Sequence, residues 1–366
     1  MEEPLKIVMT ADTVGGVWTY AVDLCEVLQQ HNVEVHLATM GKLLNQQQHK
    51  QIRKLSNVKL YESAYKLEWM QDPWNEVELA KKWLSEIIEK VKPQLLHFNN
   101  FMDFGRKWDC KVVTVFHSDV GTWWKAVKGD EAPTEWNYYI EVVASALRNS
   151  DIVIAPSRAI LEDAQDIHGA FSSVKVIYNG TELKNDSSNV KQSFIFSAGR
   201  VWDEAKNIKL LSGLAEKLVW PLYVAGDNKH PDLETAEQKY NAQFIGNLDR
   251  GQMLNMMSKA AIFTSPAKYE PFGLAVLEAA NSGCALVLSD IGTFREIWAD
   301  AALYFDPNNE DEYLSVLNRL IEDKVLRQIM MVKASERAKL YNKELTAEKY
   351  MAVYNQLLQP TYQKKT

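Results

Sequence analysis

The segment Tyr-Glu-Pro-Phe-Gly-Leu-Ala-Val-Leu-Glu, at residues 269–278, is the most informative part of the chain. The apolar run at 261–266 precedes it and is typical of a strand, and helix formers dominate 275–280 after it. Pro271 and Gly273 stand between these two segments and do not favour a helix. The sequence therefore predicts a strand, a loop and a helix in succession.

Two carboxylates bracket the loop. Glu270 is expected in the loop, facing the helix start, and Glu278 about one turn inside the helix. The unpaired N–H groups of a helix start attract anions, and Gly273 would let a phosphate approach the main chain. A carboxylate would repel the phosphate but would accept hydrogen bonds from neighbouring hydroxyls. One acid for each sugar, with a helix start between them, fits a sugar–diphosphate–nucleoside.

Glu-Pro-Phe-Gly-Leu followed by a second Glu resembles the signature of the family 4 glycosyltransferases. The resemblance implies an α/β protein with the GT-B fold: two facing Rossmann-like domains and a C-terminal helix that crosses back to the first. It also implies transfer of a sugar, a hexose by expectation, from a nucleoside-diphosphate sugar to a hydroxyl acceptor, with retention of anomeric configuration. Two acids without the Pro-Phe-Gly-Leu insert would be better explained by an exposed Glu before a helix and a second Glu on its solvated face.

The composition fits two ordinary globular domains. The chain has 366 residues, enough for two cores, with 46% hydrophobic and 24% charged residues. Its net charge of −7 argues against a nucleic-acid partner. Cys25, Cys110 and Cys284 are odd in number and lie in apolar contexts, so we expect buried free thiols in a reducing compartment.

The sequence favours a cytoplasmic protein. The N-terminus lacks the basic-then-apolar pattern of a signal peptide, and no apolar run approaches the ~20 residues of a membrane span. The polar stretch 42–60 carries Lys50, Arg53 and Lys54 and is interpreted as a solvated helix or loop. A mildly basic helix for an anionic membrane is the alternative, which leaves peripheral membrane contact open.

The first residues have the pattern that opens a doubly wound α/β domain. A strand at 5–10 leads to a glycine-rich turn, a helical pattern at 18–30 and a second strand at 33–40. The Gly-x-Gly-x-x-Gly and P-loop fingerprints are absent, and a tight turn alone would explain the glycines. In the resemblance, Gly15 and Gly16 match a Gly-Gly loop that lies beside the donor phosphates.

A histidine follows a strand of the first half. His117 ends the run at 111–117, where ligand contacts are expected at the carboxyl end of a parallel strand. The resemblance matches it to a His that touches the donor sugar. Trp123, Trp124 and Trp136 follow, and either pack in the core or form an aromatic platform for a sugar or apolar acceptor.

The second half supplies cations. A strand at 194–198 ends in Gly199-Arg200, and Lys206 follows before a helix. Arg offers a planar fork of donors and Lys a mobile point charge, so Arg200 and Lys206 are the candidates for a pyrophosphate. The family binds the diphosphate with the same pattern, which is Gly-Arg, a short gap and then Lys-Asn. As stabilisers of the leaving group, the two cations would replace a metal ion.

The resemblance assigns further residues to the donor. Residues 244–248 are similar to the segment that holds the nucleobase through main-chain groups. Many family members have Gly-Gly where this chain has Gly292-Thr293, so Thr293 is given no role. The expected catalytic residues are His117, Glu270, Arg200 and Lys206, and the expected donor-binding residues are Gly15, Gly16, Arg200, Lys206, Asn247, Leu248, Glu270, Phe272, Gly273, Leu274 and Glu278.

The predicted division has four parts. Residues 1–180 form the acceptor domain and 181–192 the linker, where Asn179-Gly180 marks a turn. Residues 193–342 form the nucleotide-sugar domain, and 343–366 the helix that returns to the first domain. Tyr350 and Tyr354 are expected on the packing face of that helix.

Other chemistries find little support. No Asp-x-Asp is present for a cation, and no His/Cys cluster has zinc spacing, so we expect neither a metal nor a cofactor. A non-catalytic sugar-nucleotide-binding protein and a GT-B epimerase stay as alternatives. The side chains do not specify the nucleobase, the sugar or the acceptor.

Overall fold

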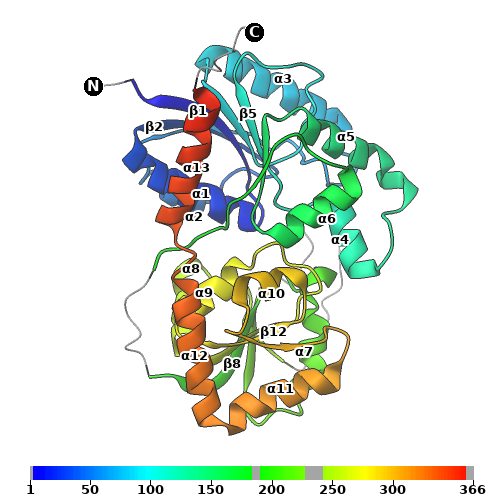
Figure 1. Cartoon of the computed structure of the whole chain (residues 1–366), viewed down its shortest axis with the longest axis vertical. Helices are drawn as coiled ribbons and strands as arrows, with labels where there is room; N and C mark the ends of the chain where they lie inside the picture. Colours follow the sequence, from blue (N-terminus) through cyan, green and yellow to red (C-terminus); the bar gives the residue numbers. More distant parts are fainter. Residues whose placement is uncertain (1–2, 184–189, 227–241, 360–366) are drawn as a thin grey trace, which may run out of the picture. The chain divides into compact units, whose positions relative to one another are not determined.

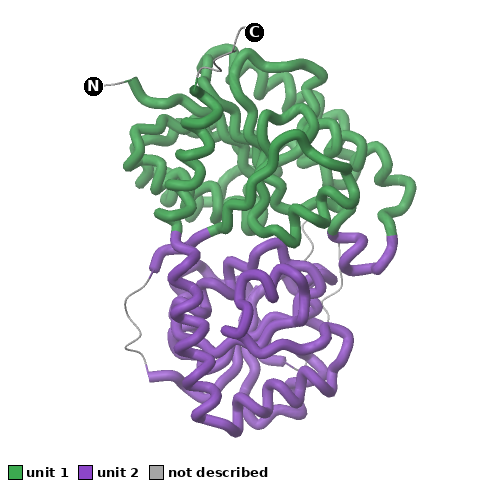
Figure 2. The backbone as a smooth tube through the Cα atoms, viewed as in Figure 1, with its two compact units in different colours: residues 1–122, 131–179, 343–366 green, residues 123–130, 180–342 purple. Residues whose placement is uncertain are grey.

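The computed structural model describes residues 3–183, 190–226 and 242–359. The chain divides into two compact units, coloured in Figure 2. Unit 1 comprises residues 1–122, 131–179 and 343–366, and unit 2 comprises 123–130 and 180–342. The predicted division kept residues 123–130 in the first domain. Residues 184–189 of the predicted linker and 360–366 of the predicted last helix lie outside the described residues.

Unit 1 is built on a seven-stranded sheet in the order β3-β2-β1-β4-β5-β6-β7, with every neighbouring pair parallel. Because the strands are parallel, the segments that follow β1, β4 and β5 leave the same edge of the sheet. The strands are β1 (Leu5–Asp12), β2 (Val33–Met40), β3 (Val58–Glu62), β4 (Leu95–Phe98), β5 (Lys111–Val115), β6 (Ile152–Ala155) and β7 (Val174–Val176).

Helices cover both faces of this sheet. Ile7 and Met9 of β1 pack in one apolar cluster and Val8 in another, as the period of two of a strand requires. The helices are α1 (Gly16–Leu28), α2 (Gln46–Ile52), α3 (Trp74–Val91), α5 (Asn137–Arg148), α6 (Arg158–His168) and α13 (Lys343–Leu358); α4 (Val120–Lys128) begins in unit 1 and continues in unit 2.

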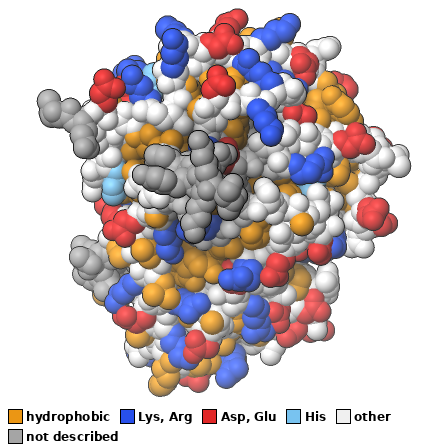
Figure 3. All heavy atoms as spheres, turned by 45° about the horizontal axis from the view of Figure 1, so that its top comes forward, with side chains coloured by type: hydrophobic (Ala, Val, Ile, Leu, Met, Phe, Trp, Pro, Cys, Tyr) orange, Lys and Arg blue, Asp and Glu red, His pale blue; other side chains and the backbone are white. Residues whose placement is uncertain are grey.

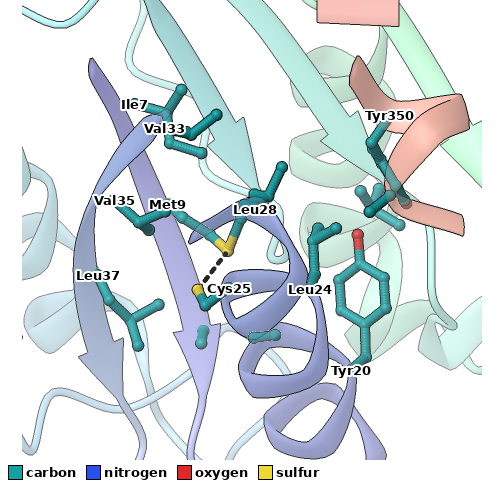
Figure 4. Close-up of a cluster of buried hydrophobic side chains, with 14 of the residues drawn as sticks. Ile7, Met9, Tyr20, Leu24, Cys25, Leu28, Val33, Val35, Leu37 and Tyr350 are labelled. Atoms are coloured by element: carbon teal, nitrogen blue, oxygen red, sulfur yellow. Dashed lines mark hydrogen bonds between the residues drawn. The ribbon is translucent and has the colours of Figure 1, made fainter. Parts of the chain in front are cut away.

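The C-terminal helix completes the core of unit 1. In Figure 1, α13 lies beside α1, although the two are separated by most of the chain. Tyr350 and Tyr354 are fully buried, and Tyr350 points toward Tyr20 of α1 in the close-up of Figure 4. A dashed line in the same view marks the contact of Cys25 with Met9, whose sulfur atoms lie 4.0 Å apart. The predicted packing face of the last helix is confirmed.

Unit 2 repeats the design with six parallel strands in the order β10-β9-β8-β11-β12-β13. Phe305 of β13 stacks on Tyr313 of α11 with ring centroids 3.6 Å apart. The elements are β8 (Gln192–Ala198), α7 (Ile208–Ala215), β9 (Leu222–Ala225), β10 (Gln243–Phe244), α8 (Arg250–Lys259), β11 (Ala260–Ser265), α9 (Leu274–Asn281), β12 (Ala285–Ser289), α10 (Gly292–Trp298), β13 (Leu303–Phe305), α11 (Glu310–Glu322) and α12 (Lys324–Ala338).

The structure adds to or changes three expectations from the sequence. The polar stretch 42–60 contains the helix α2 and the start of β3. No element was predicted for the aromatic segment around Trp74, which forms the long helix α3 with its apolar side buried in the second cluster of unit 1. Cys25 and Cys284 are buried free thiols, as expected, but Cys110, in the connection between β4 and β5, is only half-buried.

Two surface features bear on partners. None of the helices that the described residues form combines the length and apolar character needed to cross a bilayer. On the face drawn in Figure 3, Lys and Arg side chains lie among Asp and Glu side chains.

Candidate functional site

Four charged side chains of unit 2 lie close together, and we call them the charged cluster: Arg200, Asp203 and Lys206, which follow β8, and Glu270, which follows β11. Arg200 Nη2 lies 2.6 Å from Asp203 Oδ2, and Lys206 Nζ lies 2.6 Å from Glu270 Oε2. Arg200 is the more exposed cation, with 42% of its side-chain surface accessible against 17% for Lys206. Each cation therefore has a fixed carboxylate partner.

Asp203 interacts electrostatically with both cations of the cluster. Its Oδ1 accepts hydrogen bonds from the amide N of Ala205 at 3.0 Å and from Trp123 Nε1 at 3.2 Å. Burial alone would raise the pKa of Asp203, but the charges of Arg200 and Lys206, together with these hydrogen bonds, outweigh burial and lower it. Both cations thus lie within electrostatic reach of one ionised carboxylate.

Main-chain contacts bring Lys206 and Glu270 together. The carbonyl of Ala205 accepts a hydrogen bond from the amide of Lys268 at 2.8 Å, which joins the short helix η3 (Glu204–Lys206) to the loop that carries Glu270. The stem of Lys206 lies over Gly199, where an added Cβ would meet it at 3.4 Å. A side chain at position 199 would therefore crowd Lys206.

A second glycine shapes the strand end from which Arg200 projects. A Cβ on Gly226, which follows β9, would lie 1.8 Å from the carbonyl oxygen of Gly199. The amide of Gly199 in turn donates to the carbonyl of Ala225 at 3.0 Å. Only glycine at position 226 allows this close approach of the two strand ends.

The helix start predicted after residue 273 is present. Gly273 has a φ of 91° and is the N-cap residue of α9, with Leu274 as the first helical residue. Gly273 contacts the stem of Glu270, since a Cβ there would lie 3.5 Å from its Cγ. The charged cluster thus adjoins the N-terminus of an eight-residue helix. Phe272 is buried edge-on against Tyr341, so its ring belongs to the core.

Glu278 lies one turn inside α9, as expected, but it is not part of the charged cluster. Its Oε1 is 3.5 Å from Nε of Arg250 on α8. Both residues line a small cavity of about 30 Å³ together with Thr181 and Asn281.

The segment expected to hold the base precedes α8. Asn247 is exposed and Leu248 half-buried in the connection after β10. The carbonyl of Gly246 accepts a hydrogen bond from the amide of Gly226 at 2.9 Å, which links this connection to the end of β9. Asp249 caps α8 through a capping box with Gln252.

The remaining predicted residues lie in unit 1. Gly15, with φ 96°, is the N-cap residue of α1, and Gly16 is its first residue; both are exposed. His117 follows β5 at the same sheet edge and is half-buried. Its Nε2 lies 2.8 Å from Oδ1 of Asn99, and burial lowers its pKa to about 3.

The structure does not decide between core packing and an aromatic platform for the three tryptophans that follow His117. Trp18 and Trp298 are buried in the cores. Trp123, Trp124 and Trp136 are half-buried, and Trp123 donates a hydrogen bond to Asp203.

Two family models match the two halves of the chain. The model of glycosyl transferases group 1 matches residues 180–340, and the model of Glycosyltransferase Family 4 matches residues 14–185. The chain belongs to the family 4 glycosyltransferases. The resemblance seen in residues 269–278 is therefore confirmed.

Solved structures show that this chain has the GT-B fold. It superposes on sucrose-phosphate synthase from Thermosynechococcus elongatus with a TM-score of 0.79 at 19% identity, covering 96% of this chain and 98% of that one. Anabaena HepE, solved in complex with UDP and glucose, gives a TM-score of 0.71 at 14% identity, covering 96% and 100%.

Curated relatives match this chain over only part of their own length. The phosphatidyl-myo-inositol mannosyltransferase of Mycolicibacterium smegmatis is 27% identical over 166 residues, which is 43% of this chain and 43% of that protein. The chain spans about half the length of the curated relatives it matches, 43%, 56% and 57% for three of them.

Two residues that the geometry places beside predicted site residues, one in each unit, were not predicted from the sequence. Asp203 links the two cations, and Asn99 holds His117. Asn99 is the first residue after β4, and Asp203 is the fifth residue after β8. A polar residue shortly after a parallel strand is the signal that could have identified both. In the described part of the chain, no three His, Cys, Asp or Glu side chains are grouped to hold a metal ion.

Proposed function

We propose that this protein transfers a sugar from a nucleoside-diphosphate sugar to a hydroxyl acceptor, with retention of anomeric configuration and without a metal ion. The observation that carries the proposal is the 2.6 Å contact of Lys206 with Glu270 beside Gly273 at the start of α9. Relatives named as transferases of mannose and of N-acetylgalactosamine, and a relative solved with UDP and glucose, support it.

The charged cluster supplies the chemistry of the leaving group. Arg200 and Lys206 bring two positive charges, and the first amides of α9 at Leu274 and beyond add oriented N–H groups. Negative charge builds on the diphosphate as the bond to the sugar breaks, and fixed donors stabilise that charge. A divalent cation would perform the same task in a site without these cations.

The two acids bind hydroxyl groups on either side of the diphosphate. Glu270 accepts hydrogen bonds from the donor sugar, and Glu278 from the ribose. Arg250, whose Nε lies 3.5 Å from Oε1 of Glu278, orients this carboxylate. Main-chain groups at Asn247 and Leu248 hold the nucleobase, while Phe272 shapes the loop from inside the core.

Unit 1 contributes neutral groups. The exposed Gly15 and Gly16 open α1, so its first amides can face the donor phosphates without a side chain in the way. His117 contacts the donor sugar. With no covalent nucleophile assigned, the acceptor hydroxyl attacks from the side of the departing phosphate, which gives retention.

A donor screen tests the proposal. The purified chain is incubated with UDP-, GDP-, ADP- and dTDP-sugars, glycerol and simple glycosides as acceptors, and EDTA. Release of one nucleoside diphosphate together with a glycosylated acceptor of unchanged anomeric configuration is expected. Activity that needs an added divalent cation contradicts the metal-free part, and an inverted product contradicts retention.

The two alternatives give different outcomes of this screen. A binding protein raises its melting temperature with a nucleotide sugar but releases no nucleoside diphosphate with any acceptor. An epimerase converts the nucleotide sugar without any acceptor. Either result replaces the proposed function.

A further inference from the structure

His117 lies among neutral polar and aromatic groups at the carboxyl edge of the unit 1 sheet. Tyr20 of α1 meets its ring edge-on, with centroids 4.7 Å apart. His97 of β4 interacts electrostatically with His117, and its nitrogens lie 3.2 Å from the hydroxyl of Tyr20 and 2.6 Å from the hydroxyl of Tyr354 on α13. The carboxylate of Asp119 is hydrogen-bonded to His168 at 2.9 Å and to Thr122.

The amide of Asn99 can be oriented from its partners. Its Nδ2 lies 2.8 Å from the main-chain carbonyl oxygen of Thr10, which can only accept a hydrogen bond. The amide NH₂ group of Asn99 must therefore face Thr10, and the amide oxygen must face His117. This assignment follows from Thr10 and does not depend on telling nitrogen from oxygen in the side chain.

The oriented amide fixes the proton of His117. The amide oxygen of Asn99 lies 2.8 Å from Nε2 of His117 and can only accept, so Nε2 must carry the hydrogen. A neutral imidazole with a proton on Nε2 has a lone pair on Nδ1. Within the described residues, Nδ1 of His117 has no hydrogen-bond partner, and it is not one of the buried unpartnered side-chain atoms. The lone pair therefore faces accessible space.

We infer that Asn99 is a positioning residue that holds His117 in the Nε2–H tautomer, so that Nδ1 accepts a hydrogen bond from a hydroxyl of the donor sugar. This inference rests on the proposed function for the identity of the ligand. The donor sugar must therefore have a hydroxyl where it faces Nδ1 of His117. A hydroxyl donates a hydrogen bond to the Nδ1 lone pair, whereas a carboxylate or phosphate oxygen would be repelled by it. A neutral hexose fits, and a uronic acid does not.

The surroundings keep His117 neutral. Burial lowers its pKa to about 3, and neither Tyr20 nor Asn99 brings a charge near it. Burial also lowers the pKa of His97 to about 3, with the neighbouring His117 as a second cause. The Nδ1 lone pair of His117 is therefore present at every pH at which the protein is assayed.

The tautomer can be measured without any activity. The full chain is labelled with ¹⁵N-histidine, and long-range ¹H–¹⁵N correlation spectra are recorded between pH 6 and 8, with His117→Gln used to assign the signal. A protonated Nε2 and an unprotonated Nδ1 are expected, together with a mixture of tautomers in Asn99→Ala. A proton on Nδ1 in the wild type, or an unchanged tautomer in Asn99→Ala, overturns the inference.

A pH–rate profile tests the role in transfer. Asn99→Asp places a carboxylate against Nε2 and raises the pKa of His117, so kcat/KM should fall about tenfold for each pH unit below the new pKa. Tyr354→Phe is the matched control, because it removes a buried hydroxyl from His97 Nδ1 in the same unit and leaves the bond between Asn99 and His117. Its profile should keep the wild-type shape.

The two experiments separate the two claims. Identical profiles for Asn99→Asp and Tyr354→Phe contradict the positioning role of Asn99. The expected tautomer in a protein that transfers no sugar supports the geometry and contradicts the proposed function instead. Better turnover with a uronic acid donor than with its neutral hexose counterpart contradicts the requirement for a hydroxyl.

Discussion

The charged cluster of unit 2 and the surroundings of His117 in unit 1 stabilise polar side chains in opposite ways. In the charged cluster every cation has a carboxylate within 2.6 Å, and Arg200 stays 42% exposed. Around His117 the partners are an amide oxygen and an aromatic ring. One region holds charges by pairing them, and the other removes charge by burial.

The difference indicates which part of a ligand each region suits. Paired but accessible cations can exchange a carboxylate partner for a phosphate, which carries more negative charge and more acceptor oxygens. A neutral imidazole fixed by one hydrogen bond has a single acceptor to offer, which suits a hydroxyl. A sugar joined to a diphosphate has both kinds of group.

Removing a cation should have the largest effect. We expect Lys206→Ala or Arg200→Ala to lower kcat by about 10²–10³, the range for loss of one fixed stabiliser of transition-state charge. Initial rates of nucleoside diphosphate release measure it. Lys209→Ala, which changes an exposed lysine on α7, is the control and should keep the wild-type rate. Unchanged kinetics in both cation variants contradict the site.

Removing Glu278, the carboxylate proposed to bind the ribose, should weaken ligand binding more than it lowers turnover. We expect Glu278→Ala to weaken nucleoside diphosphate binding by roughly 10–100-fold, because a hydrogen bond to a charged group contributes about 1.5–3 kcal/mol. Titration calorimetry measures the affinity, with the exposed Glu216→Ala as control. Equal affinities of Glu278→Ala and wild type would remove the assigned role.

Acidification should destabilise unit 1 through its neutral histidines. Burial lowers the pKa of His97 to about 3, whereas an unfolded histidine titrates near ~6.5. The unfolded state therefore binds the proton first, and the stabilisation present above pH ~6.5 is lost as the pH falls toward the folded pKa. His97 alone lowers the free energy of unfolding by about 2 kcal/mol between pH 6.5 and 5. Urea unfolding at several pH values tests this, and a flat stability over that range contradicts it.

Replacing the glycine at each of the two helix starts by alanine should change the free energy of unfolding by different amounts. Gly273 has a φ of 91°, and a Cβ there would lie 3.1 Å from the ring of Phe294, whereas a Cβ on Gly16 meets nothing within 4 Å. We expect Gly273→Ala to lower the free energy of unfolding by about 1–2 kcal/mol, and Gly16→Ala to leave it unchanged or slightly raised. Thermal unfolding compares them, and equal shifts would mean that the backbone at Gly273 is not left-handed.

Much of the scaffold could be predicted because local signals and tertiary structure agree. The strand expected at 33–40 is β2, and the helix expected after Gly273 is α9. The stripe of Tyr350 and Tyr354 was enough to predict the buried face of α13. In each case the residue type, its spacing and its burial give the same answer.

The missed features depend on patterns that other residues obscure or on contacts between distant residues. Helix α3 was not predicted, because tryptophans and charged residues interrupt its apolar pattern, although Val77, Leu84 and Ile88 have helical spacing and are buried. Asp203 and Asn99 are ordinary turn residues in sequence. Asp203 gains its role because the turn after β8 brings Arg200 and Lys206, each three residues away, within reach of its carboxylate. Asn99 gains its role because β1, β4 and β5 lie in one parallel sheet and bring Thr10 and His117 beside it.

Recognition of the donor diphosphate by Arg200 and Lys206 underlies the whole proposal. It is tested by titrating wild type, Lys206→Ala and Arg200→Ala with a nucleoside diphosphate and with the corresponding nucleoside, using the base chosen by the donor screen. We expect the variants to lose at least about tenfold in affinity for the diphosphate, because each removes a charge-assisted contact, and to keep their affinity for the nucleoside. Equal losses for both ligands, or no loss for either, would contradict it.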